Sequence, residues 1–186
     1  MKLQILIPTL EARKEIFKPN FHALQTQISQ CGLKNQITLV IHPDAGEKSI
    51  GQKRNELMAA ATAEYVCFLD DDDPIMSNYI PSIWTGIQQG KDCVELKGIM
   101  TTNGLHPVPF HHSIKFNAYT DRNGVYLRPP NHLNPIRREL IKEFEFPSIS
   151  LGEDTDWAMQ VCRAGVIKSE AEVPHTYYFY QYLTNK

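Results

Sequence analysis

Four consecutive aspartates directly follow a short apolar run, and this junction constrains the fold more than any other part of the sequence. The run covers residues 65–69 and holds aromatic and branched side chains over a length too short for a buried helix, so it predicts a core strand. The aspartates, Asp70 to Asp73, gather negative charge at the end of that strand. Carboxylates this close repel one another unless a cation or protons relieve the repulsion. Because ligands of open α/β sheets lie at the carboxyl ends of the strands, we expect a site for a divalent cation and phosphate here.

The last aspartate also has a local interpretation that needs no ligand. Asp73 stands directly before Pro74, and this pair is typical of a helix N-cap followed by proline at the first helical position. We therefore predict that Asp73 caps a helix. One cap does not account for four aspartates, so the prediction of a site stays in place.

The composition indicates an ordinary globular protein. The 186 residues are enough for one domain with a substantial core, and 42% of them are hydrophobic. The net charge of −2 gives no global electrostatic reason to bind nucleic acid or an anionic membrane. No apolar stretch approaches the roughly 20 residues that span a bilayer, and the N-terminal apolar run is too short for a signal peptide. We expect a cytoplasmic protein without a transmembrane segment, whose four cysteines are reduced thiols.

The first half of the chain alternates strands and helices. Strand, helix, strand, helix, strand and helix are predicted, in this order, at residues 3–7, 14–30, 37–41, 51–63, 65–69 and 80–87. This order predicts a mostly parallel central sheet with helices on both faces.

The second half is less regular. A strand at 93–99 is followed by loops with short strands from 103 to 134, and then by helices at 137–144 and 154–163. No repeat or linker divides the chain, so we expect a single α/β domain over residues 1–186.

Four short motifs occur in an order that resembles one family. The motifs are Ile5-Leu6-Ile7-Pro8-Thr9-Leu10, Gly51-Gln52-Lys53-Arg54-Asn55, Phe68-Leu69-Asp70-Asp71-Asp72-Asp73 and Gly152-Glu153-Asp154-Thr155-Asp156-Trp157. Together they resemble the family-2 glycosyltransferases with the GT-A fold, over nearly the whole chain. The resemblance implies an inverting transfer of a sugar from a nucleotide-diphosphate donor, foremost a UDP-sugar, to an acceptor hydroxyl, with Mn²⁺ or Mg²⁺. It also implies a nucleotide-sugar-binding half at about 1–100 and an acceptor-binding half at about 101–186.

The resemblance places the donor at the strand ends of the first half. The implied donor contacts are Pro8, Thr9, Leu10, Glu11, Asp44, Lys53, Arg54, Asp70 and Asp71. Lys53 and Arg54 would lie beside the pyrophosphate, because cations suit phosphate and arginine can bind it with two hydrogen bonds. Both also fit a solvated helix face, and Asp44 also fits a turn after Pro43.

The same resemblance assigns the metal to the aspartate run. Asp72 is the implied ligand, and Asp70 is either a second ligand or a ribose contact. The adjacent aspartates leave this register ambiguous by one residue. His175 is a further candidate ligand, although a lone histidine is more often structural.

The acidic pair Glu153-Asp154 matches the catalytic residues of the family, with Asp154 as the base that deprotonates the acceptor. The same stretch also fits a helix N-cap. Asn131, His132 and Arg137 are the candidate acceptor contacts. The acceptor itself stays open between a glycan, a lipid-linked sugar, a protein and a modified nucleobase, and no oligomeric state is predicted.

Two alternatives remain. A nucleotidyltransferase of the same fold would normally have a glycine-rich basic loop after the first strand, and residues 8–13 contain no glycine. A non-catalytic nucleotide-sugar-binding module is disfavoured by the intact Glu153-Asp154 pair.

Overall fold

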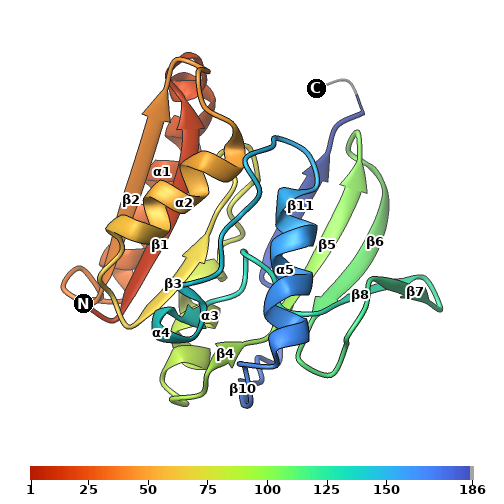
Figure 1. Cartoon of the computed structure of the whole chain (residues 1–186). Helices are drawn as coiled ribbons and strands as arrows, with labels where there is room; N and C mark the ends of the chain where they lie inside the picture. Colours follow the sequence, from red (N-terminus) through yellow and green to blue (C-terminus); the bar gives the residue numbers. More distant parts are fainter. Residues whose placement is uncertain (185–186) are drawn as a thin grey trace.

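Two sheets lie side by side in the computed structural model of the chain, which describes residues 1–184 (Figure 1). In spatial order the first sheet consists of β10 (Glu170–Ala171), β4 (Cys93–Val94), β9 (Ile136–Arg137), β3 (Tyr65–Phe68), β1 (Leu3–Leu10) and β2 (Ile37–Asp44). The second sheet consists of β11 (Tyr178–Tyr182), β5 (Leu96–Thr102), β6 (Leu105–His112), β8 (Val125–Arg128) and β7 (Thr120–Arg122).

The first sheet is mostly parallel, as predicted. β1 pairs in parallel with β2 and with β3, and β10 pairs in parallel with β4. Only β9 runs against its neighbours β3 and β4 within the described residues. The carboxyl ends of β1, β2 and β3 therefore meet at one edge, where the aspartate run begins.

Helices cover both faces of the first sheet (Figure 1). They are the 3-10 helix η1 (Glu11–Arg13) and the α-helices α1 (Lys14–Gln30), α2 (Ile50–Ala60), α3 (Tyr79–Ile87), α4 (Arg138–Ile141) and α5 (Glu153–Ala164). Alternate side chains of the strands divide the core, because successive residues of a strand point to opposite faces. Tyr65, Cys67 and Leu69 pack with α1 and α3. Val66 and Phe68 pack with α2 and α5 on the other face.

The predicted cap at Asp73 is wrong. The helix α3 begins at Tyr79 instead, and Asn78 is its N-cap residue. The carboxylate of Asp73 is buried and accepts hydrogen bonds from Tyr178 Oη (2.7 Å) and from the main-chain nitrogen of Gln181 (3.3 Å). Asp73 therefore ties the aspartate run to the last strand of the chain.

The second sheet contains two tight hairpins. Asn103-Gly104 joins β5 to β6, and Asn123-Gly124 joins β7 to β8. All four residues have positive φ, between 52° and 77°. Asn-Gly pairs are typical of the two-residue hairpin turn that needs this conformation.

Glu95 stands between β4 and β5, where the chain passes from the first sheet to the second. Its buried carboxylate pairs with Lys97 (2.6 Å) and with His111 (2.9 Å), and it accepts a hydrogen bond from the main-chain nitrogen of Val173 (2.7 Å). This carboxylate thus holds strands β5 and β6 and the segment before β11 together.

Candidate active site

The carboxyl ends of β1 and β2 are held together by a buried lysine. Lys53 Nζ donates to the main-chain oxygen of Thr9 (3.0 Å) and to Asp44 Oδ1 (2.7 Å). The other oxygen of Asp44 accepts from the main-chain nitrogen of Lys48 (3.1 Å). Asp44 and Lys53 are each at most 5% exposed. The hydrogen bond from Lys53 lowers the pKa of Asp44, so this buried carboxyl is ionised at neutral pH.

Arg13 reaches the aspartate run from η1, and we did not predict it. Its guanidinium pairs with Asp71 Oδ1 (2.9 Å) and with Asp72 Oδ2 (2.7 Å). Thr9 Oγ1 donates to the other oxygen of Asp71. Burial raises the pKa of Asp71 in spite of these two partners. The only sequence signal for Arg13 is that it follows the first strand by three residues.

Arg54 is the centre of a second group of charges. Its Nη1 donates to Glu153, and its Nη2 donates to Asp70 Oδ1 (2.9 Å) and contacts His132 Nε2 (3.0 Å). Burial alone would raise the pKa of Asp70, but Arg54 and His132 together outweigh burial and hold this pKa below its ordinary value. Asp70, Glu153 and His132 come from distant parts of the chain, and Arg54 brings them together.

The contact with Arg54 determines which nitrogen of His132 carries the proton. A guanidinium can only donate, so Nε2 accepts in this contact, and Nδ1 is the ring nitrogen that carries a hydrogen. Nδ1 is buried and has no hydrogen-bond partner among the described residues. It lies 3.9 Å from Asp154 Oδ2. The N–H of His132 is thus close to the predicted base.

The start of α2 fastens the segment that leads to α5. A Cβ at position 51 would lie 1.9 Å from the carbonyl oxygen of Pro147, so only glycine allows this close approach. The side chain of Asn55 donates to the carbonyl oxygen of Phe146 (2.9 Å) and accepts from the main-chain nitrogen of Phe146 (2.8 Å). The predicted Gly51–Asn55 motif therefore positions Glu153 and Asp154 through the loop before them.

Two cavities open at this edge of the molecule. The polar cavity, with a volume of about 640 Å³, is lined by most of the predicted donor and metal residues and also by Arg13 and Lys48. The predicted residues that line it are Pro8, Thr9, Leu10, Lys53, Arg54, Asp70, Asp71, Asp72 and Glu153. Glu11 lines an adjacent cavity that shares Thr9 and Leu10. Asp44 lies behind Lys53 and is absent from the wall of the polar cavity.

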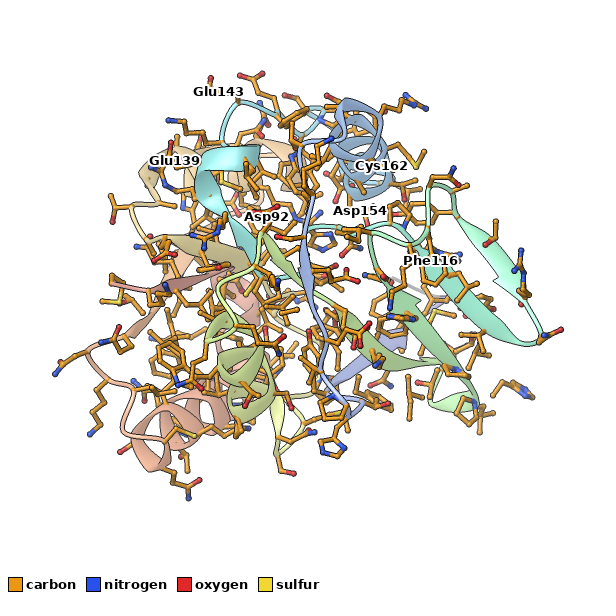
Figure 2. The ribbon with its side chains drawn as sticks, turned by 90° about the horizontal axis from the view of Figure 1, so that it is seen from below. Asp92, Phe116, Glu139, Glu143, Asp154 and Cys162 are labelled. Carbon is orange, nitrogen blue, oxygen red and sulfur yellow. The ribbon has the colours of Figure 1, made fainter. Side chains whose placement is uncertain are left out.

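The aromatic cavity, with a volume of about 220 Å³, lies between the start of α5 and the second sheet. Asp154, labelled in Figure 2, lies at the start of α5. Its neighbours on the wall include the predicted Asn131 and His132. Asp70 and Tyr180 line both cavities, so the two spaces meet at these side chains. The rings of Phe110, Tyr119, Tyr126 and Tyr180 complete much of the aromatic wall.

Two predicted site residues lie elsewhere. Arg137 pairs with Glu64 and faces Tyr65, at the amino end of β3. Five residues of extended chain, about 16 Å, separate Tyr65 from Asp70. The structure therefore places Arg137 away from the acceptor contacts predicted with it. His175 is exposed and lines neither cavity.

The aspartates on the polar cavity fit a hard divalent cation shared with phosphate. Mg²⁺-like ions are commonly held by one or two carboxylates together with substrate phosphates. Asp70, Asp71 and Asp72 all line the polar cavity. Among residues 1–184, no group of three or more His, Cys, Asp or Glu side chains is arranged to hold a metal ion by itself. Asp72 and Asp70 are the carboxylates that would hold such a cation together with phosphate.

A family model described as Glycosyl transferase family 2 matches residues 18–151. The chain belongs to this family. This confirms the resemblance drawn from the four motifs. A comparison with curated proteins gives no match.

Solved structures confirm the predicted GT-A-like fold of this family 2 member. S. aureus TarS 1-349 in complex with UDP-GlcNAc has a TM-score of 0.68 at 20% identity, over 100% of this chain and 60% of that chain. TarS 1-349 in complex with UDP has a TM-score of 0.65 at 20% identity, over 97% and 60% of the two chains. A further TarS crystal structure has a TM-score of 0.64 at 19% identity, over 97% and 37%. This chain thus spans at most about 60% of the length of these neighbours.

No helix among the described residues has both the length and the apolar character needed to cross a bilayer. The cytoplasmic location stays a prediction.

Proposed function

We propose that this protein is an inverting glycosyltransferase that moves a sugar from a UDP-sugar to an acceptor hydroxyl. The meeting of two cavities at Asp70 and Tyr180 carries this proposal. One cavity has the charges that suit a diphosphate, and the other has aromatic walls and Asp154. Membership of family 2 supports glycosyl transfer. The TarS complexes with UDP-GlcNAc and UDP support a uridine donor.

The polar cavity would hold the nucleotide sugar with its diphosphate near the aspartate run. Lys48 and Arg13 line this cavity and would supply positive charge to the phosphates. Asp72 and Asp70 would hold a Mn²⁺ or Mg²⁺ ion, which supplies charge stabilisation to the departing diphosphate when it is bound. Tyr180 stands where the sugar would cross from one cavity into the other.

The acceptor hydroxyl would enter from the aromatic cavity. Asp154 accepts the proton of this hydroxyl, and the hydroxyl oxygen forms a bond to the anomeric carbon on the face opposite the diphosphate. The bond from the anomeric carbon to the diphosphate oxygen breaks, and its electron pair leaves with the nucleoside diphosphate. His132 keeps its N–H beside Asp154, where it can donate to a carboxylate oxygen.

Donor hydrolysis tests the proposed function. The purified chain is incubated with UDP-, GDP- and dTDP-sugars and Mn²⁺, and the released nucleoside diphosphate is measured. We expect release from a UDP-sugar and its loss in Asp72→Ala. Release of pyrophosphate from a nucleoside triphosphate would instead indicate a nucleotidyltransferase. Binding of UDP-sugars without any turnover, even with acceptors present, would indicate a non-catalytic module.

The base is tested by Asp154→Asn. We expect this change to lower transfer to an acceptor by about 10²- to 10⁴-fold, because the amide cannot take the proton. Asp156→Asn is the matched control, since Asp156 is exposed in the first turn of the same helix. Full transfer by Asp154→Asn, or an equal loss in the control, would contradict the assignment.

A further inference from the structure

Arg128, the last residue of β8, lies on the wall of the aromatic cavity and is held in place on several sides. Its guanidinium stacks on the rings of Tyr119 (4.7 Å) and Tyr126 (5.1 Å). Nη1 donates to the main-chain oxygens of Thr120 (2.9 Å) and Leu127 (3.0 Å). These contacts fix the position of the guanidinium, and Nη1 is the only nitrogen that donates in them.

No carboxylate within residues 1–184 forms an ion pair with Arg128. The nitrogens Nε and Nη2 make no hydrogen bond to the described residues, so three N–H donors of the fork remain for a ligand. Arg128 does not line the polar cavity. This guanidinium therefore serves the aromatic cavity and not a diphosphate in the polar cavity.

Two further polar atoms in the aromatic cavity also need a partner. Tyr119 Oη and His132 Nδ1 are both buried and have no hydrogen-bond partner among the described residues. Buried polar groups without a partner are rare in folded proteins, so each one calls for an explanation. His132 is 4% exposed and Tyr119 stacks on Arg128. A bound molecule with several polar groups would satisfy these atoms.

Arg128 is the fixed cation of this cavity. The other basic side chains that line it within the described residues are His112 and His132. Burial lowers the pKa of His112 to about 3, so its ring is neutral. His132 turns its Nε2 to the guanidinium of Arg54. Positive charge is thus concentrated at one place on an aromatic wall.

We propose that the acceptor carries an anionic group, a phosphate or a carboxylate, that binds Arg128 while its sugar part lies along the aromatic wall. This inference rests on the proposed function and names the acceptor class. The planar fork of arginine matches the oxygens of both anions, and tyrosine rings suit the apolar face of a sugar ring. The charge would hold the acceptor on one side of the cavity, with a hydroxyl directed to Asp154.

Binding of matched sugars tests the inference. The probes are glucose, glucose 6-phosphate and glucuronate, with binding to the full chain followed by saturation-transfer NMR and titration in the presence of UDP and Mn²⁺. We expect at least one anionic probe to bind about tenfold or more tightly than glucose. Glucose 6-phosphate and glucuronate then distinguish a phosphate from a carboxylate as the preferred group.

Variants test whether Arg128 causes the preference for anionic probes. Arg128→Gln should remove this preference. Arg128→Lys should keep part of it, because lysine retains the charge but lacks the planar fork. Arg122→Gln is the control, since Arg122 is exposed on β7 and does not line the cavity. Thermal unfolding of each variant checks that it is folded.

Two results would overturn the inference. One is equal binding of the neutral and anionic probes to the unchanged protein, and the other is a preference that survives in folded Arg128→Gln. Donor hydrolysis is measured in the same samples, because it needs no acceptor. If hydrolysis is intact and either of these two results is found, this inference alone is rejected, whereas absent hydrolysis with every donor rejects the proposed function.

Discussion

Arg54 holds three polar side chains that come from different parts of the chain. It pairs with Glu153 and Asp70, and its contact with His132 leaves the imidazole hydrogen on the nitrogen nearest Asp154. The resemblance assigned Arg54 to the donor phosphates. In the structure its charge is already shared between two carboxylates, and it also arranges the wall of the aromatic cavity. A single residue can in this way link the two halves of a site.

Asparagine or glutamine at position 132 tests the roles of the two ring nitrogens of His132 one at a time. The amide of asparagine replaces Nδ1–H, and the amide of glutamine reaches the position of Nε2. We expect His132→Asn to retain about tenfold more transfer than His132→Gln, because only the former keeps a donor toward Asp154. The measurement is kcat for transfer, with the KM for the donor as the readout of a purely structural effect.

Equal kcat values for the two variants would contradict this role of Nδ1. A large change in donor KM in both variants would indicate that His132 mainly supports Arg54. Asn131→Ala is a poor control here, because Asn131 makes its own buried hydrogen bonds to His112 and Leu133. Thermal unfolding of both His132 variants therefore accompanies the kinetics.

At the scale of elements, the passage from β4 to β5 joins the two sheets through Glu95. Burial alone would raise the pKa of this carboxyl, but Lys97, the nitrogen of Val173 and His111 outweigh burial, so the pKa is lower than the ordinary value of 4.5. A carboxylate with a lowered pKa stabilises the fold at pH values above its unfolded pKa. This stabilisation is lost as the pH falls through the folded-state pKa.

Glu95→Gln should therefore lower the free energy of unfolding by about 2 kcal/mol at pH 7, since hydrogen bonds to a buried charge are lost. The difference in the free energy of unfolding between this variant and the unchanged protein should become smaller toward pH 3. Urea unfolding at both pH values measures it. Glu172→Gln is the control, because Glu172 is exposed and its pair with Lys115 is exposed too. A difference that stays constant with pH would contradict the ionised state of Glu95.

At the scale of the whole molecule, each sheet contributes one wall of the site. The segments that follow the strands of the first sheet supply the aspartate run and the cations of the polar cavity. Strands of the second sheet supply Phe110, Tyr126, Tyr180 and Arg128 to the aromatic cavity. The strand β11 belongs to the second sheet, yet it touches the aspartate run through Tyr178 and Asp73. The last strand of the chain is therefore fastened to the loop that follows β3 of the first sheet.

UDP with Mn²⁺ should stabilise the entire fold, because a ligand that binds only the folded state adds to its stability. At a concentration 100 times its Kd, we expect a gain of about 2.7 kcal/mol and a rise in Tm of roughly 5–10 °C. Differential scanning fluorimetry measures this shift. Addition of EDTA should remove most of it, and uridine with Mn²⁺ should give little. A shift that EDTA leaves unchanged would contradict a metal shared with the diphosphate.

Local patterns predicted the first half of the fold well. Strands β1, β2 and β3 and helices α1, α2 and α3 lie where apolar periodicity placed them, within a few residues. The cap at Asp73 failed because the partners of its carboxylate come from β11, more than 100 residues later. No local rule can include such a contact.

The second sheet was harder to predict because its central strand β6 contains Pro107 and Pro109, and proline normally argues against a strand. The structure explains the exception, since β8 pairs with β6 only at Phe110–His112. Both prolines therefore lie where one side of β6 has no neighbour. Likewise, Arg13 carries no motif of its own, and its position became apparent only when η1 was seen beside the aspartate run.

The two Asn-Gly hairpins have a practical consequence for engineering. Their tips, Asn103-Gly104 and Asn123-Gly124, are exposed, and a Cβ added at either glycine would meet open space. Extra residues inserted there would extend a rim of the second sheet without passing through either core. The Asn123-Gly124 tip suits such an insertion better, because Asn103 bonds Thr184 on the wall of the polar cavity.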